Sequence, residues 1–260
     1  WWFQESASEY SDRIQWFGAF TFWFIVPITI FVIVLLAIVM VRFQRRANPV
    51  ASKTSHNSLI EVVWTVAPII ILIFIAIPSF SLLKFQMVPT EEPALTVKAT
   101  GYQWYWGYEY QGESALSFDS LMIREDSDRE SLGKQDKSVY PRLLAADNEL
   151  VVPVNQMVRV LVTAADVIHA FAVPSLGFKM DAVPGRLNET WFKAAREGLF
   201  YGQCSELCGR DHAFMPIAIR VVSQESYDAW KAAAATDLDG ANRALMAATE
   251  QGTEPRVASR

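Results

Sequence analysis

Two long segments without charged residues constrain the fold of this chain more than any other feature. Residues 14–41 form a run of about 28 such residues and residues 62–83 a second run of about 22, whereas roughly 20 suffice to cross a bilayer. Prolines at positions 27, 68 and 78 lie inside these runs, which membrane helices tolerate when neighbouring helices satisfy the freed backbone groups. Buried helices of a soluble protein are the alternative, and the closeness of the two runs argues against it. We therefore expect a transmembrane hairpin with helices at about residues 14–42 and 61–83.

Basic residues predict the orientation of this hairpin. Those in or beside the connecting loop, residues 43–60, are Arg42, Arg45, Arg46 and Lys53. Such residues favour the cytoplasmic side of a membrane, or its organellar equivalent, so residues 1–13 and everything after residue 83 are expected on the exported side. Because the chain begins at Trp1 rather than Met, we also expect that an N-terminal piece, such as a targeting peptide, has been removed or is not included.

The exported part has the pattern of an all-β domain that follows a polar linker, residues 84–93. Short apolar or β-branched segments recur between glycines and prolines, at residues 95–99, 103–110, 158–163 and 215–222. They predict an antiparallel β-sandwich or barrel over residues 94–222. The charged, serine-rich stretch at residues 124–137 is interpreted as a surface loop of this domain. In residues 223–260 we expect a short helix capped by Ser223 and an Ala-rich tail that is either partly helical or disordered.

Residues 204–215 concentrate side chains that bind metals. Both cysteines, one of the three histidines and a methionine of the chain lie there, namely Cys204, Cys208, His212 and Met215. Thiolate and imidazole with a weak thioether are typical of copper electron-transfer sites rather than zinc sites. One thiolate is enough for a single copper ion, so the second suggests a pair of coppers bridged by sulfur. Two cysteines in an exported domain form a disulfide by default, but the other metal ligands beside them favour a metal.

A further ligand must come from outside this loop, and the histidines limit the choice to His56 or His169. His56 lies in the loop that is expected in the cytoplasm, across the membrane from the cysteines. His169 lies at a predicted strand end on the exported side, so we expect it to complete the site. The net charge of −5 argues against nucleic acid as a partner and allows an electropositive protein.

The segments around these residues resemble subunit II of the haem–copper cytochrome c oxidases. The most specific match is residues 201–208 with 212–216, and the supporting segments are residues 61–65, 101–106, 166–169, 172–177 and 181–186. The resemblance covers nearly the whole chain, to about Trp230. It implies a two-helix transmembrane hairpin followed by an all-β cupredoxin-like Greek-key sandwich or barrel. The implied location is a bacterial inner membrane with the β-domain in the periplasm, or the mitochondrial inner membrane with that domain facing the intermembrane space.

The resemblance also implies a binuclear copper centre of the CuA type. Its ligands would be Cys204 and Cys208 as bridges, His169 and His212 on one ion each, and Met215 and the backbone carbonyl of Glu206 as weak ligands. The carboxylate of Glu206 would bind a Mg²⁺ or Mn²⁺ ion shared with subunit I, since these hard cations prefer oxygen ligands.

The implied function is that of subunit II in a proton-pumping cytochrome c oxidase, with the lipid bilayer, subunit I, further oxidase subunits and cytochrome c as partners. Electrons from cytochrome c would arrive near Trp104 and pass to haem in subunit I, so the oxygen-reducing site lies outside this chain. The residues that would meet the lysines of cytochrome c are Glu109, Asp119 and Asp166. Glu61 would stand at the mouth of a proton-uptake path. Asp181 and Arg186 would lie near the interface with subunit I, with a purely structural turn role equally favoured.

Other functions compete with this interpretation. A membrane-anchored copper-binding electron-transfer or copper-delivery protein would also need copper ligands, but carriers favour open sites and the predicted site is closed. Nitrous oxide reductase shares the copper loop but also needs a large catalytic domain, and quinol oxidase subunits share the hairpin without these ligands. Tyr102 stands where many members of the resembling family have histidine, which affects only a local surface contact. Residues 124–137 and the C-terminal tail are not shared by the shortest members, so no function is inferred for them.

Overall fold

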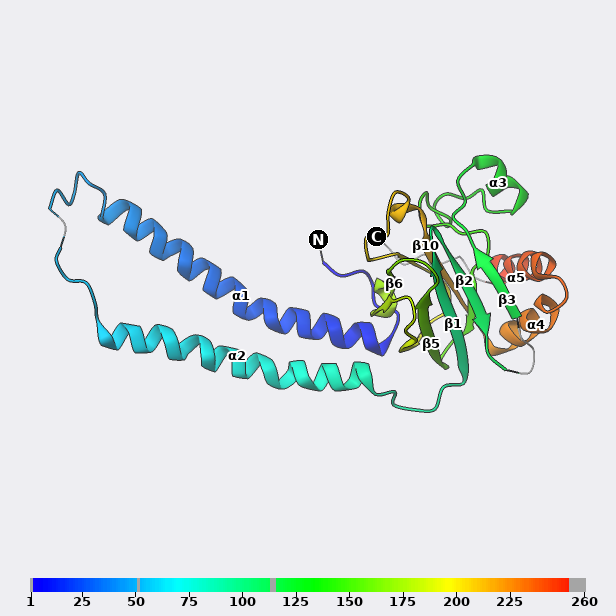
Figure 1. The fold of residues 1–260 in the computed structure, drawn as a ribbon, viewed down its shortest axis with the longest axis horizontal. Coiled ribbons are helices and arrows are strands. Elements are labelled where there is room, and N and C mark those ends of the chain that lie inside the picture. Colours follow the sequence, from blue (N-terminus) through cyan, green and yellow to red (C-terminus); the bar gives the residue numbers. More distant parts are fainter. Residues whose placement is uncertain (1, 51, 113–115, 253–260) are drawn as a thin grey trace. The chain divides into compact units, whose positions relative to one another are not determined.

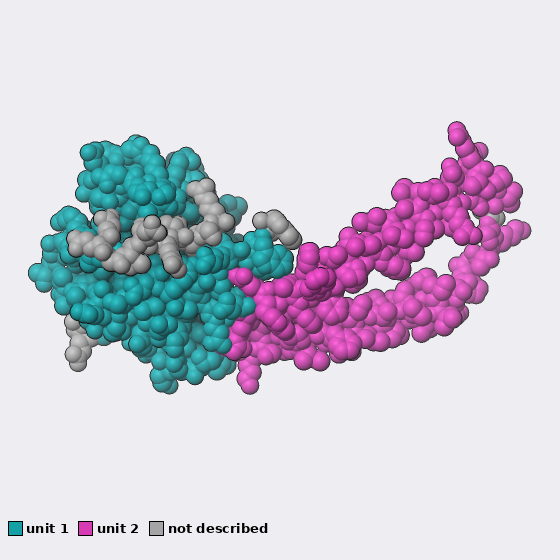
Figure 2. All heavy atoms as spheres, turned by 180° about the vertical axis from the view of Figure 1, so that it is seen from behind, with its two compact units in different colours: residues 1–12, 86–260 teal, residues 13–85 magenta. Residues whose placement is uncertain are grey.

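The computed structural model describes residues 2–50, 52–112 and 116–252, with side chains through residue 249. Two long helices come first in the chain and a β-rich domain follows (Figure 1). The chain divides into two compact units, one of Arg13–Phe85 and the other of Trp1–Asp12 with Gln86–Arg260 (Figure 2). This division agrees with the expected order of a helical hairpin and then a β-domain.

Helices α1 (Glu9–Arg42) and α2 (Ser58–Met87) are both longer than the uncharged runs that predicted them. The helix starts were predicted too late in the chain, because the prediction began each helix near the start of an uncharged run. The helices in fact begin at capping residues that lie before these runs. The Ser8 hydroxyl accepts a hydrogen bond from the Ser11 N–H at 3.0 Å, which satisfies one of the free donors of the first turn of α1. At α2, the side chain of Asn57 accepts from the N–H groups of Leu59 and Ile60 at 3.1 and 3.2 Å.

Both helices have the length and surface of membrane spans. They contain 34 and 30 residues and continue through Pro27, Pro68 and Pro78, as expected. In each, none of the most apolar 18-residue stretch is buried by the rest of the chain. Large apolar side chains such as Trp23, Phe31 and Phe74 are therefore exposed over much of the hairpin. A continuous apolar surface of this kind is stable in lipid or against other membrane helices, so this unit is a membrane unit with two spans.

The β-domain is built from ten strands in the described residues. A five-stranded sheet has the order β3 (Leu116–Ser120), β2 (Tyr105–Tyr110), β1 (Leu95–Tyr102), β5 (Met157–Ala164) and β8 (Asn188–Lys193). A three-stranded sheet has the order β4 (Leu150–Pro153), β10 (Pro216–Val222) and β9 (Gly198–Gln203), and β6 (His169–Val173) pairs with β7 (Phe178–Ala182). The predicted segments 95–99, 158–163 and 215–222 thus lie in β1, β5 and β10.

Two strand pairs among the described residues are parallel, so the expectation of an antiparallel sandwich or barrel was wrong for these pairs. β1 pairs with β5, and β4 pairs with β10, in parallel register. Neither pair is consecutive in the chain, because other strands intervene in the sequence between the two partners. Parallel neighbours need long crossover connections, and the intervening strands provide them. Alternation along a strand indicates burial on one face but does not indicate which strand lies beside it.

Aromatic side chains fill the core between the sheets. The largest fully buried ones are Trp106, Tyr108, Tyr110, Phe171, Phe178, Phe192 and Phe200. Trp106 meets the ring of Phe171 edge to face at 5.0 Å, and Phe178 stacks on Phe192 at 5.1 Å between ring centroids. Edge-to-face and offset contacts are the favoured geometries of aromatic pairs, so this packing fixes β6, the strand that begins with the predicted ligand His169.

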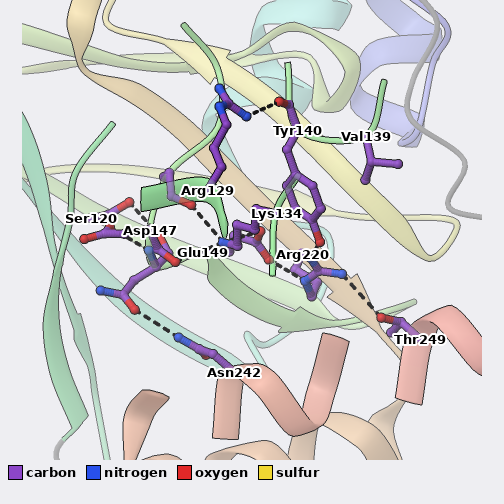
Figure 3. Close-up of polar contacts among 12 residues, drawn as sticks. Ser120, Arg129, Lys134, Val139, Tyr140, Asp147, Glu149, Arg220, Asn242 and Thr249 are labelled. Atoms are coloured by element: carbon purple, nitrogen blue, oxygen red, sulfur yellow. Dashed lines mark hydrogen bonds and ion pairs between the residues drawn. The ribbon is translucent and has the colours of Figure 1, made fainter. Parts of the chain in front are cut away.

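The stretch predicted as a surface loop, residues 124–137, is in fact partly buried. It contains the short helix α3 (Asp126–Ser131), and the side chains of Arg129 and Lys134 are almost fully buried. Lys134 Nζ lies 2.9 Å from Glu149 Oε1, and Glu149 also pairs with Arg220 (Figure 3). The prediction failed because neighbouring apolar residues pack on the outer side of β9 and β10, which covers the charged side chains between them. These apolar residues include Ile123, Tyr140, Leu199, Ala218 and Met246.

Two helices, α4 (Gln224–Ala234) and α5 (Leu238–Gly252), follow the last strand. The hydroxyl of Ser223 accepts a hydrogen bond from the Ser226 N–H at 3.1 Å, so the predicted cap is confirmed. The side chain of Asn242 joins the helices to the domain, since it accepts from Trp230 Nε1 and donates to Asn148 Oδ1, both at 2.9 Å. Of the two alternatives for the tail, the helical one holds as far as residue 252. Residues 253–260 lie outside the described residues.

Candidate metal centre

Rigid strands hold the metal-binding loop at both ends. The loop leaves β9 after Gln203 and enters β10 at Pro216, and these two residues are paired across the sheet. The N–H of Cys204 donates to the carbonyl of Met215 at 3.4 Å, and the N–H of Ser205 donates to the carbonyl of Ala170 in β6 at 3.1 Å. The loop is therefore fixed against the strand that begins with His169.

The predicted copper ligands lie close together in the structure. The sulfur atoms of Cys204 and Cys208 are 3.8 Å apart. Further distances are 3.9 Å from Cys204 Sγ to His169 Nδ1, 3.4 Å from Cys208 Sγ to His212 Nδ1, 3.6 Å from Cys208 Sγ to Met215 Sδ, and 3.3 Å from Cys204 Sγ to the carbonyl oxygen of Glu206. Ligand atoms of His169, Cys204 and Cys208 all lie within 4.8 Å of one another. One loop and one strand end thus bring sulfur and nitrogen donors to a single point.

His169 is held in the orientation that a metal ligand needs. Its side chain is fully buried, and its Nε2 atom lies 2.9 Å from the carboxylate oxygen Oδ1 of Asp166. With Nε2–H donating to Asp166, Nδ1 is left to face Cys204 with its lone pair. Burial raises the pKa of Asp166, but hydrogen bonds from His169 and from the N–H groups of Val167 and Gln103 outweigh burial and hold this pKa below its usual value. The carboxylate therefore stays charged and keeps the imidazole in place.

The two thiols differ in how readily each loses its proton. Burial raises the pKa of Cys204, but the hydrogen bond to His169 and nearby backbone groups outweigh burial and lower it to about 7. Burial, and next the negative charge of Cys204, raise the pKa of Cys208 to about 12. One thiolate thus forms easily, whereas the second needs positive charge beside it. Bound cations would supply that charge, and metal binding would then be coupled to release of the proton.

The donor set fits copper. Thiolate, imidazole and thioether are soft or borderline donors, and Met215 is almost fully buried, so the thioether is positioned without competition from water. The carbonyl of Glu206 faces the sulfur of Cys204, whereas the carboxylate side of the residue is exposed. Glu206 can therefore offer a weak carbonyl ligand inward and a hard carboxylate ligand outward.

Two glycines support this centre in a way that the sequence reasoning missed. Gly101 falls between the predicted strand segments 95–99 and 103–110, but it lies inside β1, and a β-carbon there would be 2.8 Å from Cδ2 of His169. A β-carbon on Gly202 would overlap the carbonyl of Ala172 in β6. Both residues let a neighbour approach closely, and a glycine within an otherwise regular strand is the signal that points to such an approach.

Trp104 lies in the turn between β1 and β2 and not on a strand. Tyr102 pairs with Tyr105, which leaves Gln103 and Trp104 as a two-residue connection. The predicted strand segment 103–110 would place Trp104 and Trp106 on one face, but the strand begins only at Tyr105, so the alternation of faces does not include Trp104. Trp106 is buried, whereas Trp104 is half-buried, and its indole N–H donates to the carbonyl of Cys208 at 3.2 Å. The side chain of Gln103 donates to the same carbonyl at 2.9 Å.

The three predicted docking carboxylates have different surroundings. Glu109 and Asp119 line a shallow concavity of about 340 Å³ on the outer face of β1, β2 and β3, and Glu109 pairs with Lys98 at 2.7 Å. Asp166 instead supports the metal centre through His169 and accepts from the N–H of Gln103 at 2.8 Å. Its supporting role was missed, although its position three residues before a candidate histidine ligand is a usable signal.

The remaining predicted residues lie outside the copper cluster. Glu61 is in the membrane unit, where its carboxylate accepts from the N–H of Asn57 at 3.3 Å and so helps to cap the start of α2. Asp181 and Arg186 are both exposed, and Asp181 lies 3.9 Å from Lys179. The exposed loop that contains Arg186 follows β7, the strand paired with the one that begins at His169.

Comparisons with known proteins agree with this geometry. Residues 95–222 match the family model "Cytochrome C oxidase subunit II, periplasmic domain", and residues 1–82 match "Cytochrome C oxidase subunit II, transmembrane domain". A probable cytochrome c oxidase subunit 2 of Rickettsia felis is 51% identical over 247 residues, which are 94% of this chain and 75% of the relative. Cytochrome c oxidase subunit 2 of Cereibacter sphaeroides is 48% identical over 239 residues, covering 88% of this chain and 78% of the relative.

A solved structure of a similar domain is also known. The crystal structure of the periplasmic domain of subunit II of cytochrome oxidase from Bradyrhizobium japonicum is 58% identical in sequence. It covers 55% of this chain and 95% of its own, with a TM-score of 0.49. The family models together match most of the chain, and they include both the helical hairpin and the domain that holds the CuA-type cluster of cysteine and histidine ligands. The chain therefore belongs to the cytochrome c oxidase subunit II family.

Proposed function

We propose that this chain accepts electrons from cytochrome c at a binuclear copper centre and passes them to haem in subunit I of a proton-pumping oxidase, where oxygen is reduced to water. The hydrogen bond between Trp104 and the carbonyl of Cys208 is the observation that carries this proposal. It joins a half-buried surface indole to the backbone of a bridging ligand. An electron that arrives at the indole from a docked partner thus has a short bonded path to the centre.

The ligand arrangement suits electron transfer. A sulfur-bridged pair of copper ions, when bound, supplies one-electron redox chemistry. The chain's own part is to hold its ligands still, since His169 is fixed by Asp166 and the loop is tied to β6 and β10. Burial of His169, Cys204, Cys208 and Met215 keeps water from the ligand atoms, and the weak donors and hydrogen bonds around sulfur tune the potential.

The acidic surface suits a cationic redox partner. Glu109 and Asp119 on the outer sheet face, and Asp166 beside the Gln103–Trp104 turn, would attract the lysines of cytochrome c. Such attraction raises the association rate more than the affinity and weakens with salt. Glu109 pairs with Lys98 and Asp166 with His169, which reduces the share of each, so the exposed Asp119 is proposed as the strongest contributor.

The same loop is proposed to meet subunit I. The exposed carboxylate of Glu206 would bind a Mg²⁺ or Mn²⁺ ion together with ligands from that subunit, and Asp181 and Arg186 would lie near the contact. The basic residues of the loop between α1 and α2 favour the cytoplasm, or its organellar equivalent, as the proposed location of that loop. The β-domain would then face the bacterial periplasm or the mitochondrial intermembrane space. Glu61, at the start of α2, stays a prediction for the mouth of a proton-uptake path.

The test is a Trp104→Leu variant in the assembled oxidase. Copper content and the mixed-valence electron spin resonance spectrum should be kept, because no ligand is changed. Electron transfer from reduced cytochrome c, followed by stopped flow, should slow by about a hundredfold, the loss typical of misplacing a reacting group. Tyr105→Leu is the matched control. Tyr105 stacks on Tyr102, so this variant also removes an aromatic ring next to the same turn. A single copper per chain, or an unchanged rate in Trp104→Leu, would overturn the proposal.

A further inference from the structure

An ion-pair chain connects the segment between β3 and β4 to Trp104. Arg210 follows the bridging ligand Cys208 by two residues, and its guanidinium carbon lies 5.5 Å from the centroid of the Trp104 ring. Asp211 holds this guanidinium with both carboxylate oxygens, at 3.1 Å to Nε and 3.4 Å to the terminal nitrogen. Asp211 Oδ2, the oxygen that the terminal nitrogen of Arg210 contacts, also lies 3.4 Å from a terminal nitrogen of Arg124. Arg124 belongs to the stretch that was interpreted from sequence as a surface loop without assigned function.

The far end of this chain is firmly anchored. The segment that carries Arg124 is fixed by the buried pairing of Lys134 with Glu149, and Lys134 also donates to the carbonyls of Ala146 and Asp147 at 2.8 and 2.9 Å (Figure 3). Arg124 itself lies over the ring of Phe214, two residues after His212, at 5.5 Å. The segment can therefore act as a rigid support against which the metal loop is held.

The indole of Trp104 is restrained on more than one side. Its N–H is bonded to the carbonyl of Cys208, and a β-carbon on Gly209 would lie 3.0 Å from Cζ2 of the ring. Gly209 also has φ of +120°, where other residues are strained, so the loop backbone lies directly against the ring. The guanidinium of Arg210 adds a planar, charged group that stacks on aromatic faces and pairs with a carboxylate through two N–H groups at once.

We propose that Arg210 is a positioning residue for electron transfer: held by Asp211 and Arg124, it keeps the indole of Trp104 in the orientation that bonds to Cys208. This inference rests on the proposed role of Trp104 as the residue where electrons arrive. Arg124 acts through its ion pair with Asp211. The stretch between β3 and β4 thereby gains a function, which is to brace the metal loop from outside.

Removing Arg210 should separate two kinetic quantities. In the assembled oxidase, Arg210→Gln should lower the first-order rate of electron transfer within the preformed complex by roughly tenfold, since small displacements of a reacting group are costly. Association with the cationic partner at low salt should be unchanged or faster, because a positive charge has left the docking surface. A loss of folding would lower both quantities together. Arg142→Gln is the matched control, since Arg142 is exposed in the same segment and undergoes the same charge change.

Two further variants distinguish positioning from charge. Arg210→Lys keeps the charge but loses the planar, forked group, so it should be as slow as Arg210→Gln. Arg124→Gln should slow transfer in the same direction, and the double variant should be no slower than Arg210→Gln alone, because both changes act on one chain of contacts. Full recovery in Arg210→Lys, or strictly additive losses in the double variant, would overturn the proposal.

A spectroscopic readout without copper tests the orientation directly. The full chain in detergent, labelled with 5-fluorotryptophan, gives a fluorine resonance for Trp104 that is assigned by its loss in Trp104→Phe. This resonance should move in Arg210→Gln and in Arg124→Gln and stay in place in Arg142→Gln. The role of Arg210 would be overturned if the resonance did not move and if Arg210→Gln transferred electrons at the normal rate. Slow transfer in Trp104→Leu would in that case leave the role of Trp104 standing. Normal transfer in Trp104→Leu would instead overturn the underlying function.

Discussion

A β-carbon on Gly101 would lie 2.8 Å from Cδ2 of His169, so the imidazole fills the space that a side chain at position 101 would occupy. Gly101 is in the middle of the five-stranded sheet, paired with Trp106 on one side and Ala164 on the other. Trp106 meets the His169 ring at 6.1 Å between centroids. The position of this copper ligand is therefore set by the sheet core as well as by its own strand.

Gly101→Ala should weaken copper binding without changing any ligand. The added methyl group cannot move away, because strands hold the backbone on both sides, so the His169 ring must shift from the two sulfur atoms. We expect copper affinity to fall by about 10–100-fold, similar to the loss of a residue that orients a metal ligand. Copper content and the electron spin resonance spectrum measure this. Thr100→Ala, on the opposite face of the same strand, should keep full copper, and an unchanged spectrum in Gly101→Ala would refute the prediction.

Asp166→Asn should affect the metal centre more than the docking surface. The amide cannot supply the negative charge that holds Nε2–H of His169, so the ring loses its preferred orientation and we expect copper affinity to fall by about 10–100-fold. Copper retention against a competing chelator measures the loss. The matched variant Asp119→Asn removes the same charge from the outer sheet face and should retain copper fully. Equal retention in both variants would show that Asp166 acts only as a surface charge.

The copper ligands could be predicted from the sequence because their chemistry is local. Five of the six predicted ligands fall within residues 204–215, and His169 was the one further histidine expected on the exported side to complete the set. The membrane helices could also be predicted from the sequence, because the length of an uncharged run can be counted directly and compared with the thickness of a bilayer. The contacts of Gly101 with His169 and of Gln103 with Cys208 were not accessible, because each joins residues that are distant in sequence.

The parallel strand pairs and the buried charges were missed for a related reason. A strand's apolar pattern tells which face is buried, but the neighbours of β1 and β10 are decided by the path of the whole chain. Residues 124–137 contain many charged residues, and charged side chains are mostly exposed. Arg129 and Lys134 are exceptions because each meets an acceptor inside the domain, the carbonyl of Tyr140 at 2.6 Å and the carboxylate of Glu149 at 2.9 Å.

Glu149 gives the domain a stability that depends on pH. Its carboxylate is buried between Lys134 and Arg220, and Arg220 also reaches the hydroxyl of Tyr140 at 3.1 Å (Figure 3). Burial raises the pKa of Glu149, but attraction to Arg220 and then Lys134 outweighs burial and lowers it from 4.5 to about 2. Because the folded pKa lies below the unfolded one, the charged form stabilises the fold. This contribution is complete above pH 4.5 and is lost as the pH falls toward 2.

We therefore expect the free energy of unfolding of the β-domain to fall by roughly 3 kcal/mol from this group between pH 5 and pH 2. Glu149→Gln should cost about 3–5 kcal/mol at neutral pH, because it leaves two buried cations without their counter-charge, and it should flatten the dependence below pH 5. Unfolding midpoints followed by near-ultraviolet circular dichroism across this range measure both effects. Glu130→Gln is the control. Glu130 is exposed on α3, so this variant removes an equal charge from the same segment. If Glu149→Gln kept the full acid dependence of the wild type, other carboxylates would have to be its source.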